Sequence, residues 1–266
     1  MKYPKAIFLA CLLLISHFAL SQQLDSIDHY FSSIAVSGSD EEMLLYNDSL
    51  TNSMLSYLDL EEDIIGTEIP DMPYLGQVTS RDSLVKIFSW NIPLSDGDNL
   101  YNCIIYNHKL DNKTFIRGKE GLTEIAMDAV FESSDWYGSL YYDMQPLEEG
   151  DSMSYILLGF DPDNVYMNSK VVEVLHFDDN GRPVFGKKIF SGENEANTRL
   201  VFRYSPLAIM SLQFSPDRSM IIFDHLAPSS PRFEGQYMYY GPDFSYDALE
   251  FIDGKLILVE DIDPGK

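Results

Sequence analysis

Apolar residues near the N-terminus recur at helical spacing in two stretches. Residues 24–34 carry an apolar side chain every three or four positions, and residues 43–58 carry a second stripe of the same kind. Between the stripes, Ser39 followed by Glu42 is a capping-box pattern, which starts a helix. We therefore expect residues 22–62 to form a helical hairpin.

Beyond residue 80 the pattern changes to short runs of Tyr, Phe, Ile and Val separated by turn residues, which is typical of antiparallel strands. Asn180-Gly181 and Asp253-Gly254 each lie between two such runs, and both pairs are typical of type I′ hairpin turns. The expected strands are 84–90, 101–108, 113–117, 139–144, 154–160, 171–177, 183–190, 200–204, 209–214, 220–225, 236–240, 248–252 and 255–259. Residues 63–266 are thus predicted to form a mainly β domain, an antiparallel sandwich or an irregular multi-sheet fold.

A small β-propeller is the alternative architecture. Residues 214–223, which read Phe-Ser-Pro-Asp-Arg-Ser-Met-Ile-Ile-Phe, resemble the turn-and-strand unit of TolB-type propeller blades, and residues 79–88 are a weaker match. The number of residues between Asp82 and Asp217 corresponds to about three blades of roughly 45 residues each. The intervening positions hold no matching unit, and a serine-proline-aspartate turn before a strand is also ordinary turn chemistry.

Residues 1–21 carry the three parts of a secretory signal peptide: a lysine-containing start, an apolar run at residues 6–20, and small residues at Ala19 and Ser21. The run is shorter than the roughly 20 residues that a spanning helix needs, so we expect no membrane span after signal removal. Cys11 resembles a lipoprotein acceptor, but the apolar run continues beyond it, which argues against lipidation. We expect an exported protein of the periplasm, the cell surface or the extracellular space.

The composition and charge of the chain exclude several classes of protein. At 266 residues, 45% hydrophobic and 13% aromatic, the chain is too apolar to be disordered. Its 42 acidic residues outnumber its 18 basic residues and give a net charge of −24, so the phosphates of nucleic acids and anionic membranes would be repelled. We therefore expect no nucleic acid partner, and the class that remains is an acidic, β-rich globular protein.

Common catalytic motifs are missing from the sequence. It holds no Gly-rich phosphate loop and no H-E-x-x-H, C-x-x-C or G-x-S-x-G motif. Cys103 lies in a strand-like run and is expected to be a small buried residue. Asp224-His225 is the most suggestive pair, but neighbours on a strand point to opposite faces, so we expect a structural role for these side chains.

Calcium is the one metal that the acidic loops suggest, and no other cofactor is expected. Exported acidic proteins can hold calcium through oxygen-rich loops, for which Asp161, Asp163 and Asn164 are the candidate ligands. A second acidic segment, residues 178–181, is better explained as a hairpin turn. Neither segment has the spacing of a twelve-residue calcium loop with its terminal Glu.

Residues 235–247 contain five aromatic residues together with Gly, Pro and Asp. Aromatic faces beside carboxylates can stack on sugars or anchor a protein partner. In this interpretation Tyr240, Asp243, Tyr246 and Asp247 form one rim, where a glycan, a peptide or an envelope protein would bind. In the other interpretation alternate aromatics fill the core while the Pro-Asp pair turns the chain.

Three C-terminal segments resemble one family. Residues 220–228 read Met-Ile-Ile-Phe-Asp-His-Leu-Ala-Pro, residues 240–249 read Tyr-Gly-Pro-Asp-Phe-Ser-Tyr-Asp-Ala-Leu, and residues 260–263 read Glu-Asp-Ile-Asp. They resemble the C-terminal pattern of a family of uncharacterised exported proteins of Bacteroidota-type bacteria, over residues 70–263, with a departure at Leu256, where the pattern has Trp. The resemblance implies export and a β-rich fold, and it carries over no catalytic residues.

These observations favour a secreted or periplasmic, non-enzymatic binding or envelope-associated accessory protein. Two alternatives stay open. The first is an exported hydrolase acting on glycans or peptides, which would need two carboxylates about 5–10 Å apart in a pocket. The second is a propeller-like scaffold for protein interactions, which would show four-stranded blades around a central channel.

Overall fold

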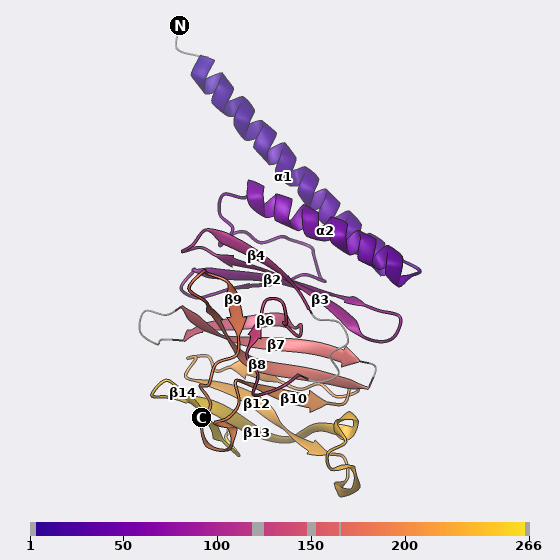
Figure 1. The fold of residues 1–266 in the computed structure, drawn as a ribbon, viewed down its shortest axis with the longest axis vertical. Helices are drawn as coiled ribbons and strands as arrows, with labels where there is room; N and C mark the ends of the chain where they lie inside the picture. Colours follow the sequence, from indigo (N-terminus) through magenta and orange to yellow (C-terminus); the bar gives the residue numbers. More distant parts are fainter. Residues whose placement is uncertain (1–3, 119–124, 148–152, 165, 264–266) are drawn as a thin grey trace. The chain divides into compact units, whose positions relative to one another are not determined.

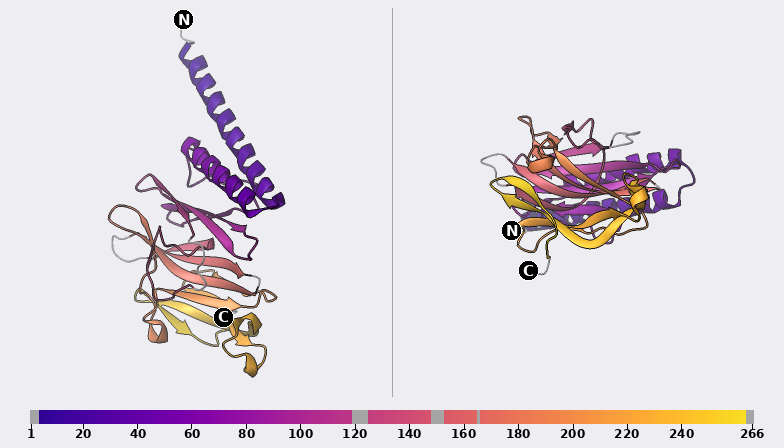
Figure 2. Two further views of the ribbon diagram at one scale, coloured as in Figure 1. Left: turned by 45° about the vertical axis from the view of Figure 1, so that its right-hand side comes forward. Right: turned by 90° about the horizontal axis from the view of Figure 1, so that it is seen from below.

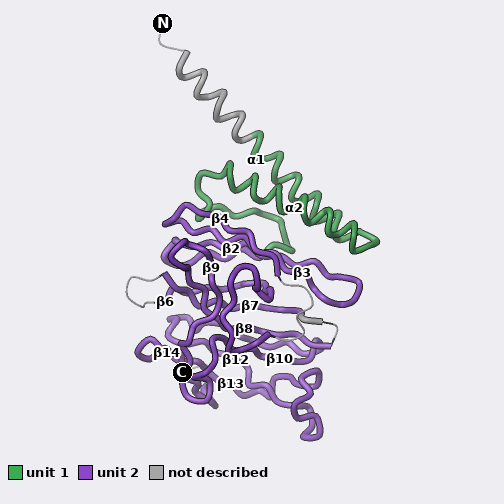
Figure 3. Tube along the Cα trace, in the orientation of Figure 1, with its two compact units in different colours: residues 1–75 green, residues 76–266 purple. Residues whose placement is uncertain are grey.

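A computed structural model describes residues 4–118, 125–147, 153–164 and 166–263, with the backbone alone described for residues 4–17, 163 and 164. The chain divides into two compact units, residues 1–75 and residues 76–266 (Figure 3). Strands hold 42% of the residues and helices 21%, so the fold is mainly β, as predicted.

The described residues of the first unit form two helices followed by a loop segment. Helix α1 spans Pro4–Val36 and helix α2 spans Asp40–Leu60. The hairpin predicted for residues 22–62 corresponds to α2 and the later part of α1, which begins earlier than predicted. Ser39 caps α2, because its hydroxyl oxygen accepts a hydrogen bond from the backbone N–H of Glu42 at 3.3 Å. Neither described helix combines the length and the apolar content that crossing a membrane takes.

In the described part of the second unit, the strands form three antiparallel sheets (Figure 1). Sheet A joins β1 (Gly76–Thr79), β2 (Val85–Pro93), β3 (Asn99–Asn107) and β4 (Asn112–Arg117) in chain order. Sheet B holds β5 (Phe131–Glu132), β6 (Leu140–Leu147), β7 (Ser154–Asn164), β8 (Met167–Phe177), β9 (Pro183–Phe185) and β10 (Arg199–Tyr204) in the order β5-β9-β8-β7-β6, with β10 also paired to β8. Sheet C joins β11 (Leu212–Phe214), β12 (Met220–Pro228), β13 (Tyr240–Ile252) and β14 (Lys255–Val259) in chain order. The short 3-10 helices η1 (Gly192–Asn194), η2 (Pro231–Phe233) and η3 (Tyr237–Tyr239) lie in the connections.

Sheet B lies between sheets A and C, and both of its faces are buried (Figure 1 and Figure 2). On β7, Tyr155 and Leu157 belong to the core shared with sheet A, whereas Ile156 and Leu158 belong to the core shared with sheet C. Side chains alternate between the two faces of a strand, so a strand buried on both faces needs an unbroken apolar run. This requirement explains the continuous apolar sequence of residues 154–160.

The turn between the first two strands of sheet A recurs between the first two strands of sheet C. The Ser80 hydroxyl donates to Asp82 Oδ1 at 2.5 Å, and the Ser215 hydroxyl donates to Asp217 Oδ1 at 2.7 Å. In both turns the serine oxygen also accepts the backbone N–H five positions later, at 2.9 and 3.2 Å. The residue after each aspartate has a positive φ, 58° in the first turn and 63° in the second.

The three sheets share features with propeller blades but do not close into a ring. Strand β6 contacts both neighbouring sheets, because the N–H of Tyr141 donates to Ser89 Oγ at 3.2 Å and the Tyr142 hydroxyl donates to the Leu212 carbonyl oxygen at 2.8 Å. A propeller closes about 4–8 blades around a channel, whereas the described strands form an open stack with no closed barrel. The multi-sheet prediction is confirmed, and the likeness to a propeller is limited to the repeated turn and the up-and-down connections.

Of the two turns predicted to be type I′, the structure confirms the type of one and not of the other. Asp253-Gly254 has positive φ at both residues, 50° and 75°, as a type I′ turn requires. Asn180-Gly181 does lie in a hairpin, between the antiparallel strands β8 and β9, but the predicted turn type is wrong, because only Gly181 has a positive φ, of 75°. The Asp178 carboxylate accepts two backbone N–H groups of this connection, at 2.9 and 2.8 Å, and so stabilises a longer loop.

The strand predicted at residues 236–240 is also wrong. Gly235, with a φ of 76°, redirects the chain, and helix η3 follows. The ring of Tyr239 stacks on Phe233 with 4.1 Å between the ring centroids, so these aromatics pack locally instead of joining the sheet. Regular strand structure begins at Tyr240 and runs on through the Pro-Asp pair, which therefore does not turn the chain.

Candidate functional site

An open groove lies at the end of sheet C, where the β12–β13 hairpin meets the loop between β10 and β11. Its volume is about 690 Å³, and it is lined by Tyr166, residues 205–208, residues 227–229 and residues 238–243. The described lining carries one charged side chain, that of Asp243, among tyrosine, leucine, methionine and proline side chains. A concave, mostly apolar surface with few polar groups is typical of a binding site.

Main-chain contacts hold the two walls of the groove together. The N–H of Ser205 donates to the carbonyl oxygen of Tyr240 at 2.9 Å. At Gly241 the two segments pack closely, because a Cβ atom there would lie 3.3 Å from the Cβ of Ala208, which is a tight contact. At the tip of the hairpin, the N–H of Gly235 donates to the Tyr240 hydroxyl at 2.9 Å. The shape of the groove is therefore set by the backbone of both segments.

Large apolar side chains around the groove are exposed to solvent. Leu207, Ile209 and Phe244 are 96%, 91% and 95% exposed, and Tyr166 is 63% exposed. Phe244 also has a φ of 75°, a left-handed conformation that is strained for a bulky residue. Leu207 and Tyr166 line the groove, whereas Ile209 and Phe244 directly follow lining residues in the sequence. Exposed apolar groups close together mark interaction sites, unlike apolar residues scattered singly. Packing does not account for a strained and solvent-exposed Phe244.

The structure brings two of the four predicted rim residues to this groove. Tyr240 and Asp243 line it, whereas Tyr246 and Asp247 lie further along β13, outside the described lining. Asp247 is 5% exposed, and Tyr246 is half-buried opposite Asp224 of β12. A register shift between β12 and β13, directly after Asp224, separates the two pairs of residues.

His225 lies at this register shift and is held by a carboxylate of the neighbouring strand. Its Nδ1 donates to Asp247 Oδ2 at 2.8 Å, and Asp247 Oδ1 accepts the backbone N–H of Asp261 at 3.1 Å. The hydrogen bond to Asp247 raises the pKa of His225 above its ordinary value, with Asp243 and Asp261 adding to the effect and partial burial opposing it. The imidazole is 42% exposed, and its second nitrogen has no hydrogen-bond partner among the described residues.

The side chain of Asp224 points away from that of His225, as strand alternation predicts. Its Oδ2 accepts the backbone N–H of Ser211 at 2.6 Å, which fixes the loop before β11. Sequence reasoning missed the pairing of His225 with Asp247. Both residues are notable in the sequence, but nothing local indicates that they meet across two strands at an irregular register.

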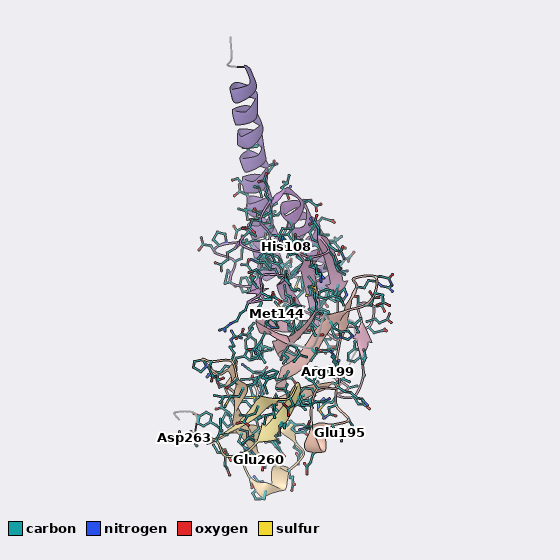
Figure 4. The ribbon with its side chains drawn as sticks, turned by 90° about the vertical axis from the view of Figure 1, so that its left-hand side faces the viewer. His108, Met144, Glu195, Arg199, Glu260 and Asp263 are labelled. Atoms are coloured by element: carbon teal, nitrogen blue, oxygen red, sulfur yellow. The ribbon has the colours of Figure 1, made fainter. Side chains whose placement is uncertain are left out.

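A second polar cluster is buried inside the sheet domain. Glu173 and Arg199 have no exposed surface and form an ion pair, with 3.2 Å between Oε2 and Nε; Arg199 is labelled in Figure 4. Glu173 Oε1 accepts the hydroxyl groups of Tyr137 and Tyr141 at 2.7 and 2.5 Å. Burial raises the pKa of both tyrosines well above the ordinary value, so they keep the protons that they donate. Because solvent does not reach the cluster, its role is structural.

Sequence reasoning also missed this cluster. The available signal was a single glutamate in the middle of the apolar run 171–175. Strand burial on both faces forces such a residue into the interior, where an ionised carboxylate needs a charged or hydrogen-bonding partner.

The calcium prediction concerns residues that the structure describes only in part. Asp161 is 6% exposed and accepts a hydrogen bond from the Tyr101 hydroxyl, while the side chains of Asp163 and Asn164 lie outside the described residues. Within the described ranges, no group of three or more His, Cys, Asp or Glu side chains is arranged to hold a metal ion. Cys103 is buried, as expected, and burial raises the pKa of its thiol, which keeps it unreactive. Calcium binding stays a prediction.

Comparison with known proteins adds no assignment. No protein-family model matches this chain, and no curated protein matches it. The family resemblance of the C-terminal segments stays a prediction.

Proposed function

We propose that this chain is a non-enzymatic binding protein whose partner occupies the groove at the end of sheet C. The observation that carries the proposal is the exposure of Leu207 in the lining of that groove, together with the exposed Ile209 and Phe244, which directly follow lining segments in the sequence. Soluble proteins rarely expose apolar side chains of this size together unless another molecule covers them. The signal-peptide pattern of residues 1–21 makes the periplasm or the cell surface the place where the partner is met.

Catalysis has weaker support than binding. The candidate acid–base group is His225, with Asp247 as its carboxylate partner. Such a pair works in hydrolases by activating a hydroxyl or thiol within hydrogen-bond reach, and among the described residues no nucleophile is bonded to His225. A hydrolase acting on glycans or peptides therefore remains the second candidate function.

A thermal-shift screen of the full chain tests the proposal. The panel contains glycans, peptides, calcium and other divalent metals. A compound present at about 100 times its dissociation constant should add roughly 2.7 kcal/mol to the free energy of unfolding, which gives a measurable rise in the Tm.

Two variants locate the site of any compound that raises the Tm. Leu207→Asp places a charge in the groove and is expected to abolish the shift, because the variant presents a carboxylate where the ligand needs an apolar surface. Leu110→Asp is the matched control, since Leu110 is 51% exposed in the connection between β3 and β4. A shift that persists unchanged in Leu207→Asp means that the compound binds elsewhere, which would contradict the proposal.

A further inference from the structure

We infer that the occupant of the groove is a polypeptide segment that carries apolar side chains together with lysine or arginine. The inference rests on the proposed binding function and adds the chemical class of the partner. Two neighbouring features carry it: the apolar anchors around the groove, and the carboxylates gathered beside them.

The apolar part of the groove suits the side chains of a polypeptide better than a sugar. Leu207, Met238 and three proline rings supply carbon atoms instead of hydrogen-bonding groups. A glycan needs hydrogen-bond partners for its hydroxyl groups as well as an aromatic face. The hydroxyl of Tyr240 already accepts the N–H of Gly235, which leaves it less suited to that role.

One carboxylate lines the groove, and further acidic groups lie beyond its lining. Asp243 belongs to the lining, and Asp247 follows it on the same strand. The chain after β14 adds more acidic groups, because the N–H of Asp261 donates to Asp247 Oδ1 at 3.1 Å and so holds residues 260–263 beside β13. Glu260 and Asp263, the other acidic residues of this segment, are labelled in Figure 4.

Two arginines lie near the groove, outside its described lining. The described lining contains no lysine or arginine. Arg203 and Arg232 lie over the rings of Tyr237 and Phe233 and keep their positive charge there. These two rings pack against Tyr240 and Tyr239 of the lining.

The carboxylate of Asp243 inside the lining and the net charge of −24 nevertheless favour a negative potential at the groove. Asp243 and Asp261 also raise the pKa of His225, although its hydrogen bond to Asp247 is the larger cause. Opposite charge on a partner attracts and orients it at such a surface.

A second copy of the chain and an anionic membrane fit this surface less well. The net charge of the chain is −24, so two copies meeting at their grooves would bring like-charged segments together. Anionic lipid headgroups carry the same sign as the carboxylates and would be repelled.

Fluorescence anisotropy with three labelled peptides of equal length tests the inference. The first peptide alternates Leu with Lys, the second alternates Leu with Glu, and the third alternates Ser with Lys. The full chain is expected to bind the Leu-Lys peptide at least about tenfold more tightly than either of the others, because only this peptide offers both the apolar contact and the opposite charge.

Matched variants measure separately how much the apolar contact and the opposite charge contribute to this affinity. Leu207→Ser should weaken binding of the Leu-Lys peptide about tenfold, and Asp243→Asn should weaken it about threefold. Leu110→Ser and Glu193→Gln change exposed residues of the same types outside the groove and should leave the affinity unchanged.

The outcomes separate this inference from the proposed function. Equal binding of the Leu-Lys and Leu-Glu peptides, lost in both cases by Leu207→Ser, would leave the groove as a binding site and overturn the basic partner. Equal weakening by Glu193→Gln and Asp243→Asn, with no effect of Leu207→Ser, would reduce the attraction to net charge and overturn both proposals. A dimer seen by sedimentation equilibrium and broken by Leu207→Ser would make a second copy the occupant, which also overturns the inference.

Discussion

Arg199→Met is expected to destabilise the protein strongly, because it leaves Glu173 buried without its ionic partner. Neither side chain has exposed surface in the folded protein. The guanidinium group also donates to the carbonyl oxygens of Ala126, Ala129 and Phe185, at 2.6, 2.8 and 3.1 Å. Methionine follows the arginine side chain as far as Nε, so the change removes the charge and the donors with a smaller loss of packing than alanine would cause.

The magnitude follows from the contacts that are lost. Removing one partner of a buried ion pair costs about 3–5 kcal/mol. The carbonyl of Ala129 keeps a second donor, the Thr198 hydroxyl at 2.5 Å, and loss of the bonds to the other carbonyls adds about 1 kcal/mol. The expected total is about 5 kcal/mol, out of roughly 5–15 kcal/mol for an ordinary domain. For a domain of this size, the Tm should fall by about 10–20 °C.

Urea unfolding followed by tryptophan fluorescence measures the change. Trp136 reports on the cluster directly, because its indole N–H donates to the Tyr141 hydroxyl at 3.0 Å. Arg182→Met is the matched control: this arginine pairs with Asp178 but is 65% exposed, so its loss should cost less than about 1 kcal/mol.

A double variant separates charge burial from lost packing. Glu173→Gln combined with Arg199→Met removes both charges, and the glutamine oxygen still accepts the hydroxyl groups of Tyr137 and Tyr141. It should be about 2 kcal/mol more stable than Arg199→Met alone. A double variant less stable than the single one, or an Arg199→Met effect no larger than that of the control, would refute the reasoning.

Smaller effects are expected at His225, at the repeated turns and at Phe244. Because the bond to Asp247 raises the pKa of His225, protonated His225 stabilises the fold below about pH 6.5, and this stabilisation is lost as the pH rises through the folded-state pKa. His225→Gln should therefore lower the urea midpoint at pH 5 and change it little at pH 9; an equal loss at both would contradict the protonated pairing. Ser80→Ala and Ser215→Ala should each cost about 1 kcal/mol in urea unfolding, and costs that differ by more than about 1 kcal/mol would argue against a shared turn. Phe244→Gly relieves a left-handed strain, so it should raise the free energy of unfolding by less than about 1 kcal/mol and the Tm slightly. A clear fall in the Tm would show that the ring packs.

The mainly β fold is predictable from the sequence because strands and tight turns leave local patterns. The apolar runs at residues 154–160 and 171–177 become β7 and β8 of the central sheet. The stacking of the sheets is not predictable in this way. Leu157 and Leu158 are identical residues, and only contacts distant in sequence decide that one faces sheet A and the other sheet C.

The candidate site is predictable only in part, for a related reason. Tyr240 and Asp243 attract notice through the aromatic and acidic composition of their segment. Leu207 and Ile209 lie in the loop before β11, where apolar residues next to a strand are expected in the core, yet both are exposed. The loop reaches Tyr240 through a main-chain hydrogen bond from Ser205, and main-chain bonds leave no trace in side-chain patterns.

The two polar clusters of the sheet domain differ in a way that bears on function. Glu173 is surrounded by partners in a closed interior, so its charge serves the fold. His225 lies at a register shift with its ring 42% exposed, beside a backbone strained at Phe244. Strain of this kind persists where the surrounding structure holds it, and it clusters at functional sites. Exposed apolar side chains, backbone strain and unbalanced charge meet at one end of one sheet, and a bound partner would account for all three. A change at Leu207 should therefore alter binding without disturbing the Glu173 cluster.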